Sequence, residues 1–135
     1  MNERFVDTGF WIGVTFPRDQ RHTEAKRIFY ELPPSDVFVT SEFVLIEYLN
    51  HFSERGPEMR RFAANFIRSL EDNKRTRVIP VSRELYLRGL SRFERYHDKG
   101  WSLTDCTSFL IMEDFGIHHA LAFDNHFEQA GFQVM

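Results

Sequence analysis

Four acidic side chains occur where a short apolar segment ends or where a helix is expected to begin. Asp7 and Asp124 each follow an apolar run directly. Glu47 and Asp105 lie within the first turn or two of predicted helices. Because ligands in open α/β sheets bind beyond the carboxyl ends of the strands, residues from distant parts of the chain can meet there. We therefore expect these four acids to converge on one site.

A convergence of carboxylates predicts a bound cation. Like charges at short range raise the pKa values of carboxyl groups unless a cation neutralises them. A site made only of oxygen ligands favours hard cations such as Mg²⁺ or Mn²⁺. Such ions lower the pKa of a bound water and brace the attacking and leaving oxygens of an in-line displacement. The four acids therefore indicate metal-dependent hydrolysis that needs no protein nucleophile.

Each acid considered alone also has a structural interpretation. Asp7 and Asp124 are typical of turns that follow strands, and Asp105 is typical of a helix N-cap. Glu47 is different because it lies in an apolar segment, and glutamate is rarely buried without a function. The prediction of a metal site therefore depends on the four acids together.

The segments around these acids alternate between short apolar runs and longer stretches with helical periodicity. This alternation predicts the α/β class, with a parallel sheet covered by helices. Strands are expected at 5–6, 37–40, 77–81 and 120–123, with an edge strand at 132–135. Helices are expected at 10–14, 18–32, 43–50 and 57–70, and Ser41 is expected to cap the third of these. Two further helices are expected, one from a cap at Ser82 to about residue 100 and one that begins at Thr104 or Asp105.

Length and composition predict one compact domain spanning residues 1–135. The 15 Phe among 135 residues predict a core rich in phenylalanine. Cys106 is the only cysteine, so one chain cannot form a disulfide framework or a thiolate zinc cluster. We expect a cytoplasmic protein, because the polar residues 1–4 do not resemble a secretory signal and no run approaches 18 apolar residues.

The charge is distributed unevenly along the chain. The net charge is -3, which argues against a protein that binds nucleic acid nonspecifically over its whole surface. Residues 55–99 contain 12 Lys or Arg against 6 Asp or Glu, whereas the remainder contains 5 against 14. The basic side chains of this segment could lie on the solvent-exposed faces of helices, or they could form a patch that guides phosphates, and both interpretations stay open.

Four segments in order resemble the motifs of PIN-domain nucleases. They are residues 5–9, 47–50, 101–106 and 121–127, and the resemblance extends over nearly the whole chain. The likeness is to the VapC-like ribonuclease toxins of prokaryotes. It implies a PIN-like three-layer α/β/α sandwich with a central, mainly parallel sheet.

The resemblance also implies roles for individual residues. The quartet that binds Mg²⁺ or Mn²⁺ and performs catalysis would be Asp7, Glu47, Asp105 and Asp124. Thr8 would be the small hydroxyl beside the first acid. Asn50, one helical turn after Glu47, would steady that carboxylate.

Several other side chains have a structural interpretation that we favour. Gly9 stands where many relatives have Ser, which removes one hydrogen bond beside the site. His126 stands where some relatives have a further Asp, and we expect a surface histidine. Trp11 and Trp101 could stack on bases, but both lie in apolar segments and are expected in the core. Cys106 has no obvious base beside it, so we expect a buried structural thiol.

The function implied by the resemblance is a metal-dependent endoribonuclease that hydrolyses RNA phosphodiester bonds, as the toxin of a type II toxin-antitoxin pair. Its expected partners are an RNA substrate, a small antitoxin protein and a second copy of the chain, without a membrane. A catalytically silent RNA-binding or protein-binding module is the alternative. A phosphatase or receiver-like domain also places an Asp at a strand end, but a phosphatase would need a second Asp at the position of Gly9.

Overall fold

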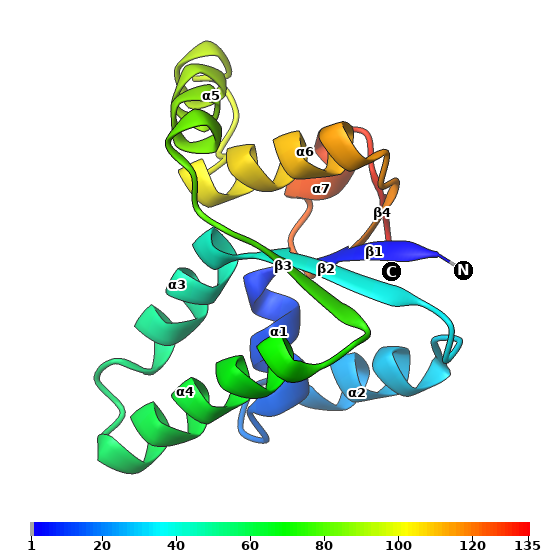
Figure 1. Ribbon diagram of the computed structural model, residues 1–135, viewed down its shortest axis with the longest axis vertical. Coiled ribbons are helices and arrows are strands. Elements are labelled where there is room, and N and C mark those ends of the chain that lie inside the picture. The colour runs from blue at the N-terminus through cyan, green and yellow to red at the C-terminus, as the bar shows by residue number, and fades with distance from the viewer. Residues whose placement is uncertain (1) are drawn as a thin grey trace.

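A five-stranded, entirely parallel sheet forms the centre of the computed structural model, which describes residues 2–135 (Figure 1). The strand order is β3-β2-β1-β4-β5. The strands are β1 (Glu3–Val6), β2 (Val37–Ser41), β3 (Thr76–Ile79), β4 (His119–Leu121) and β5 (Gln133–Val134). Since β1 is central and pairs in parallel with both β2 and β4, the carboxyl ends of these three strands lie at one edge.

Helices cover both faces of the sheet. They are α1 (Thr8–Thr15), α2 (His22–Glu31), α3 (Glu42–Phe52), α4 (Pro57–Asp72), α5 (Arg83–Arg95), α6 (Leu103–Phe115) and α7 (His126–Gln129). In Figure 1, α1 to α4 lie on one side of the sheet, and α5, α6 and α7 lie on the other. This arrangement confirms the expected three-layer α/β/α sandwich.

The boundaries of several elements differ from the sequence-based expectation. α2 begins at His22 rather than at residue 18, because the Asp19 N–H donates to Phe16 O in a turn (3.0 Å). α5 ends at Arg95, where Tyr96 leaves the helical conformation with φ -100° and ψ 49°. The N-cap of α6 is Ser102 rather than Thr104 or Asp105, and β4 ends at Leu121.

The core is rich in phenylalanine, as expected. Trp11 and Trp101 are both buried in it, and so is the Cys106 thiol, which confirms their structural interpretation. The Trp11 indole donates from Nε1 to Thr40 Oγ1 (3.2 Å), so its polar atom has a protein partner. The fully buried phenylalanines are Phe5, Phe10, Phe52, Phe109 and Phe127.

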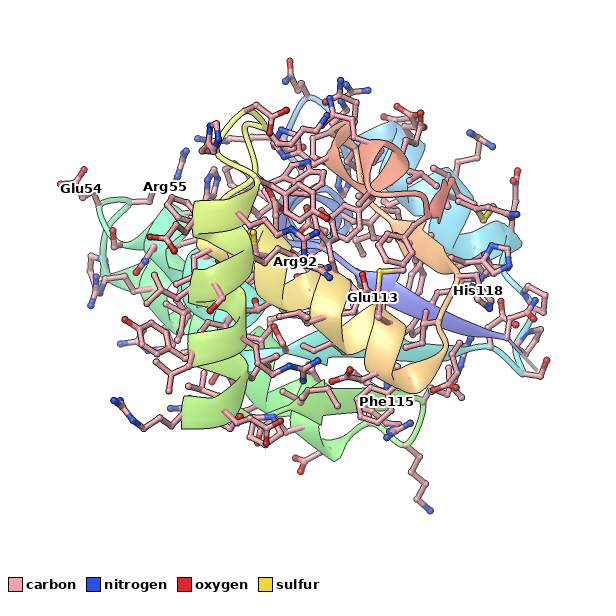
Figure 2. The ribbon with its side chains drawn as sticks, turned by 90° about the horizontal axis from the view of Figure 1, so that it is seen from above. Glu54, Arg55, Arg92, Glu113, Phe115 and His118 are labelled. Carbon is pink, nitrogen blue, oxygen red and sulfur yellow. The ribbon has the colours of Figure 1, made fainter. Side chains whose placement is uncertain are left out.

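Two bidentate ion pairs join α5 to α6. Arg88 donates to both carboxylate oxygens of Asp114 (2.7 and 2.9 Å), and Arg92 does the same with Glu113 (2.7 and 2.9 Å). Figure 2 shows Arg92 and Glu113 on these neighbouring helices. The helices approach closely at Gly89, where an added Cβ would lie 2.7 Å from Thr107 Cγ2. These contacts fix the position of α6.

Two sets of arginines in the basic segment differ in their surroundings. Arg88, Arg92 and Arg77, which pairs with Glu3 at 3.2 Å, form ion pairs with acidic side chains. Another set lines a groove of about 560 Å³ beside α4, formed with residues of α3. A phosphate-guiding role stays a prediction for this second set, which consists of Arg60, Arg61 and Arg68.

No helix within residues 2–135 has the length and the apolar character that a membrane span requires.

Candidate active site

The central strand delivers Asp7 to the carboxyl edge of the sheet. The Asp7 N–H donates to Leu121 O (3.0 Å), which extends the pairing of β1 with β4 by one residue. Asp7 then serves as the N-cap residue of α1, and its carbonyl accepts from the Trp11 N–H (3.2 Å). The carboxylate is consequently held at a junction between two neighbouring strands and a helix, and the residue is only 6% exposed.

Glu47 reaches the same place from α3. Ser41 Oγ caps this helix by accepting from the Val44 N–H (3.1 Å), which sets the direction in which α3 leaves β2. Thr8 Oγ1 donates to Glu47 Oε1 at 2.7 Å. Thr8 therefore orients the Glu47 carboxylate beside Asp7.

The described part of the structure shows no contact that would let Asn50 steady the Glu47 carboxylate, and a role for Asn50 beside the site stays a prediction. Asn50 is exposed and lines the groove beside α4 with Arg60 and Arg61. Residues three positions apart are neighbours on a helix surface, but Asn50 lines the groove beside α4 and Glu47 lines the acidic cavity. Within residues 2–135 no hydrogen bond joins Asn50 to Glu47, and Thr8 provides the contact instead.

Asp105 is positioned by the start of α6. Ser102 Oγ accepts from the Asp105 N–H (3.0 Å), and Asp105 Oδ2 accepts from the Ser102 N–H (3.0 Å). This reciprocal capping box fixes the carboxylate in the first turn of the helix. Asp105 is 6% exposed, so its burial matches that of Asp7.

Asp124 lies in the turn between β4 and α7, and His126 is the first residue of α7. Asp124 Oδ1 accepts from the His126 N–H (3.0 Å), which closes the turn. The His126 Nδ1 atom lies 2.9 Å from Asp105 Oδ2 and 3.9 Å from Asp124 Oδ2. The expectation of a surface histidine was therefore wrong, because the turn directs the ring toward the acids and leaves its side chain 28% exposed.

All four acids and Thr8 line one cavity of about 420 Å³, and they come from four separate segments of the chain. A larger hollow of about 770 Å³ lies between Arg18 and Phe62 and is lined by a single carboxylate, Glu58, so size does not identify the site. The further lining residues of the acidic cavity are Gly9, Ile12, Gly100, Ser102, Phe123 and His126.

Crowding of the carboxylates perturbs their protonation. Burial raises the pKa of Asp7 well above its ordinary value, and the nearby charges of Asp105, Asp124 and Glu47 raise it further. Burial also raises the pKa of Asp105, although the hydrogen bonds from Ser102 and His126 act in the opposite direction. A crowded set of oxygen donors of this kind is chemically suited to a divalent cation that neutralises it.

Two residues of the site were missed by sequence reasoning. Phe123 lines the cavity and stacks on Phe10 with ring centroids 5.7 Å apart, so it, and not a tryptophan, is the aromatic side chain beside the acids. His126 adds the only nitrogen-containing side chain of the cavity wall within the described residues. Its spacing of two residues from Asp124 is the feature that indicates a closed turn.

Known proteins share this fold and much of this sequence. Residues 4–133 match the family described as PIN domain. The 23S rRNA-specific endonuclease VapC20 of Mycobacterium tuberculosis is 36% identical over 128 residues, which cover 95% of this chain and 94% of that protein. The crystal structure of VapC20, described as a sarcin-ricin loop cleaving toxin, has a TM-score of 0.83 at 34% identity over 95% of both chains.

More distant solved structures share the fold alone. VapBC2 from Rickettsia felis, bound to a promoter DNA fragment, has a TM-score of 0.64 at 9% identity, over 98% of this chain and 97% of that one. FitAcB from Neisseria gonorrhoeae has a TM-score of 0.63 at 12% identity, over 97% and 95% of the two chains. The match to the family over residues 4–133, together with 36% identity to a relative along 95% of the sequence, shows that this chain belongs to the PIN domain family.

Proposed function

We propose that this chain is a metal-dependent endoribonuclease that hydrolyses RNA phosphodiester bonds. The observation that carries the proposal is the meeting of Asp7, Glu47, Asp105 and Asp124 in one cavity. A relative with 36% identity is named for its action on 23S rRNA, which favours RNA as the substrate. The proposed metal ligands are the same four acids.

Mg²⁺ or Mn²⁺ in this cavity would supply an activated water and charge to stabilise the leaving oxygen. The protein orients the groups around that chemistry. Thr8 fixes one oxygen of Glu47 at 2.7 Å. Ser102 and His126 both contact Oδ2 of Asp105, at 3.0 and 2.9 Å, which leaves Oδ1 of Asp105 available for an ion.

The wall of the cavity also carries groups that suit RNA. Phe123 is half-buried there, and the Arg21 guanidinium lies over its ring at 5.1 Å from the centroid. Aromatic rings and arginine planes are the surfaces on which unpaired bases stack. We infer that a loop or single strand, rather than a regular duplex, enters the site.

The proposal predicts that RNA cleavage requires a divalent cation. An RNA hairpin carrying the sarcin-ricin loop should be cleaved with Mg²⁺ or Mn²⁺, and cleavage should fall by on the order of a thousandfold in chelator, because the ion supplies several kcal/mol of transition-state stabilisation. Gel analysis of end-labelled RNA measures the rate. A DNA strand of the same sequence is the control for RNA specificity.

The catalytically silent alternative predicts a different result. A binding module should retain its affinity for the hairpin in chelator and should leave the RNA intact when metal is restored. Cleavage that persists fully in chelator would instead contradict the role of the four acids. The two outcomes are separated by measuring binding and cleavage on the same labelled hairpin.

We also propose that the chain forms a homodimer through α5. Tyr86, Leu87, Leu90 and Phe93 are 38–48% exposed on this helix, although large contiguous apolar patches are rare on monomers. These apolar side chains follow one another at helical spacing along α5. An isologous pairing of two antiparallel α5 helices would bury the same apolar residues of both copies against each other.

Leu90→Glu should convert the dimer to a monomer, because it would bury a charge in the apolar contact. Light scattering during size-exclusion chromatography measures the mass. Tyr30→Glu is the matched control, since Tyr30 is 77% exposed on α2 and should leave the dimer intact. A wild-type mass of 16.1 kDa at micromolar concentration would contradict the dimer.

We propose a toxin that is held inactive by a small antitoxin protein. The support is the 34% identity to a structure described as a toxin, together with an acidic cavity that can accept a cationic side chain. An arginine of the partner could pair with these carboxylates in a bidentate manner and neutralise them in place of a cation.

A further inference from the structure

His126 differs from the other ionisable side chains of the cavity because it offers a nitrogen. One ligand atom each from Asp105, Asp124 and His126 lie within 4.8 Å of one another. The ring nitrogen that faces the acids is Nδ1, at 2.9 Å from Asp105 Oδ2 and 3.9 Å from Asp124 Oδ2. A short movement of these groups would bring all three around one ion.

The direction of the His126 ring is fixed by its surroundings. Its backbone N–H is held by Asp124 Oδ1 (3.0 Å). The next residue, Phe127, is fully buried and packs edge-on against Phe109, with ring centroids 5.0 Å apart. The other ring nitrogen, Nε2, faces Gly100, where an added Cβ would lie 3.8 Å away. Nδ1 is therefore presented to the acids by an anchored segment.

We propose that His126 Nδ1 is a direct ligand of the metal, together with Asp105 and Asp124, so that the site selects transition-metal ions over Mg²⁺. This inference depends on the proposed metal-dependent function. Imidazole nitrogen is a common ligand of first-row transition metals, whereas Mg²⁺ prefers oxygen ligands and retains its waters. A neutral ring with its proton on Nε2 directs the Nδ1 lone pair toward the acids.

A second role for the same nitrogen must be distinguished from this one. A protonated Nδ1 would donate to Asp105 Oδ2 and merely orient that carboxylate, and one nitrogen cannot donate and coordinate at the same time. His126→Asn separates the two roles. The asparagine amide can still donate a hydrogen bond to Asp105, but it has no imidazole lone pair.

The first measurement is the affinity of the full-length protein for Co²⁺ and Mg²⁺, each added alone, by titration calorimetry. His126→Asn should weaken Co²⁺ binding by more than the roughly tenfold to hundredfold that is typical for loss of a group that only orients a metal ligand. The affinity for Mg²⁺ should change little, so the preference for Co²⁺ should fall by the same factor. His118→Asn is the matched control, because His118 is exposed and precedes β4 at the opposite edge of the sheet (Figure 2).

The second measurement observes the nitrogen itself. Pulsed electron paramagnetic resonance of the Mn²⁺-loaded protein should reveal a directly coordinated nitrogen in the wild type and in His118→Asn, and none in His126→Asn. Absence of that coupling in the wild type, or equal losses of Co²⁺ and Mg²⁺ affinity in His126→Asn, would overturn the inference and leave His126 as a positioning residue. Failure of every divalent ion to bind would instead refute the proposed function.

Discussion

Asp7→Asn is expected to reduce RNA cleavage by on the order of a thousandfold or more while the protein stays folded. The substitution removes a charge that the metal needs and changes the side-chain volume very little. Asp7 is also the acid nearest the centre of the sheet, where its N–H donates to Leu121 O, and its pKa is raised by burial and further by the other three acids. No neighbouring carboxylate can replace it without moving a strand or a helix.

Without metal, the same substitution should stabilise the fold in a pH-dependent manner. Burial and the neighbouring acids raise the folded-state pKa of Asp7. The unfolded-state pKa of an Asp carboxyl group is about 4. When the folded-state pKa is higher than this, the contribution of the group to folding stability is most favourable below pH 4, and it is lost as the pH rises through the folded-state pKa. The melting temperature of the metal-free wild type should therefore fall as the pH rises from about 4 through the raised pKa of Asp7, and that of Asp7→Asn should fall less.

Melting temperatures in chelator from pH 4 to pH 8, measured beside cleavage rates, test both statements. Asp114→Asn is the control of opposite sign, because the hydrogen bond from Arg88 lowers the pKa of Asp114 and the native pair stabilises the fold at higher pH. Full activity in Asp7→Asn would refute its catalytic role. Unfolding of Asp7→Asn would show that the side chain is structural.

The parts of the site that sequence predicted are those set by local structure. Asp7 follows the central strand and Ser41 caps α3, and both positions can be recognised from a few neighbouring residues. The capping box between Ser102 and Asp105 also has a recognisable spacing, although the sequence interpretation placed the cap at Thr104 or Asp105. Convergence followed from parallel pairing, since carboxyl ends then share one edge.

The parts that could not be predicted depend on packing between distant segments. His126 faces Asp105 because Phe127 is locked against Phe109, a contact between α7 and α6 that no local pattern encodes. Thr8 reaches Glu47 only because α1 and α3 leave adjacent strands side by side.

A cationic partner and the metal should compete for the acidic cavity. If an antitoxin arginine enters among Asp7, Asp105 and Asp124, it neutralises the same carboxylates that would hold an ion. The two occupants are then mutually exclusive, and the apparent affinity of the partner should fall by the factor that metal occupancy imposes. At a Mn²⁺ concentration of about 100 times its dissociation constant, that factor is about a hundredfold.

Partner affinity measured by calorimetry across a Mn²⁺ titration tests this competition, with the ionic strength held constant by a monovalent salt so that screening does not change. Replacing the inserted arginine of the partner with Gln should remove the dependence on Mn²⁺, because the glutamine cannot neutralise the carboxylates. Unchanged affinity over the titration, with the resonance of Mn²⁺ showing a filled site, would mean that the partner binds elsewhere. A falling affinity that persists with the Gln variant would point to a conformational change on metal binding, because direct exclusion by one charge would then be ruled out.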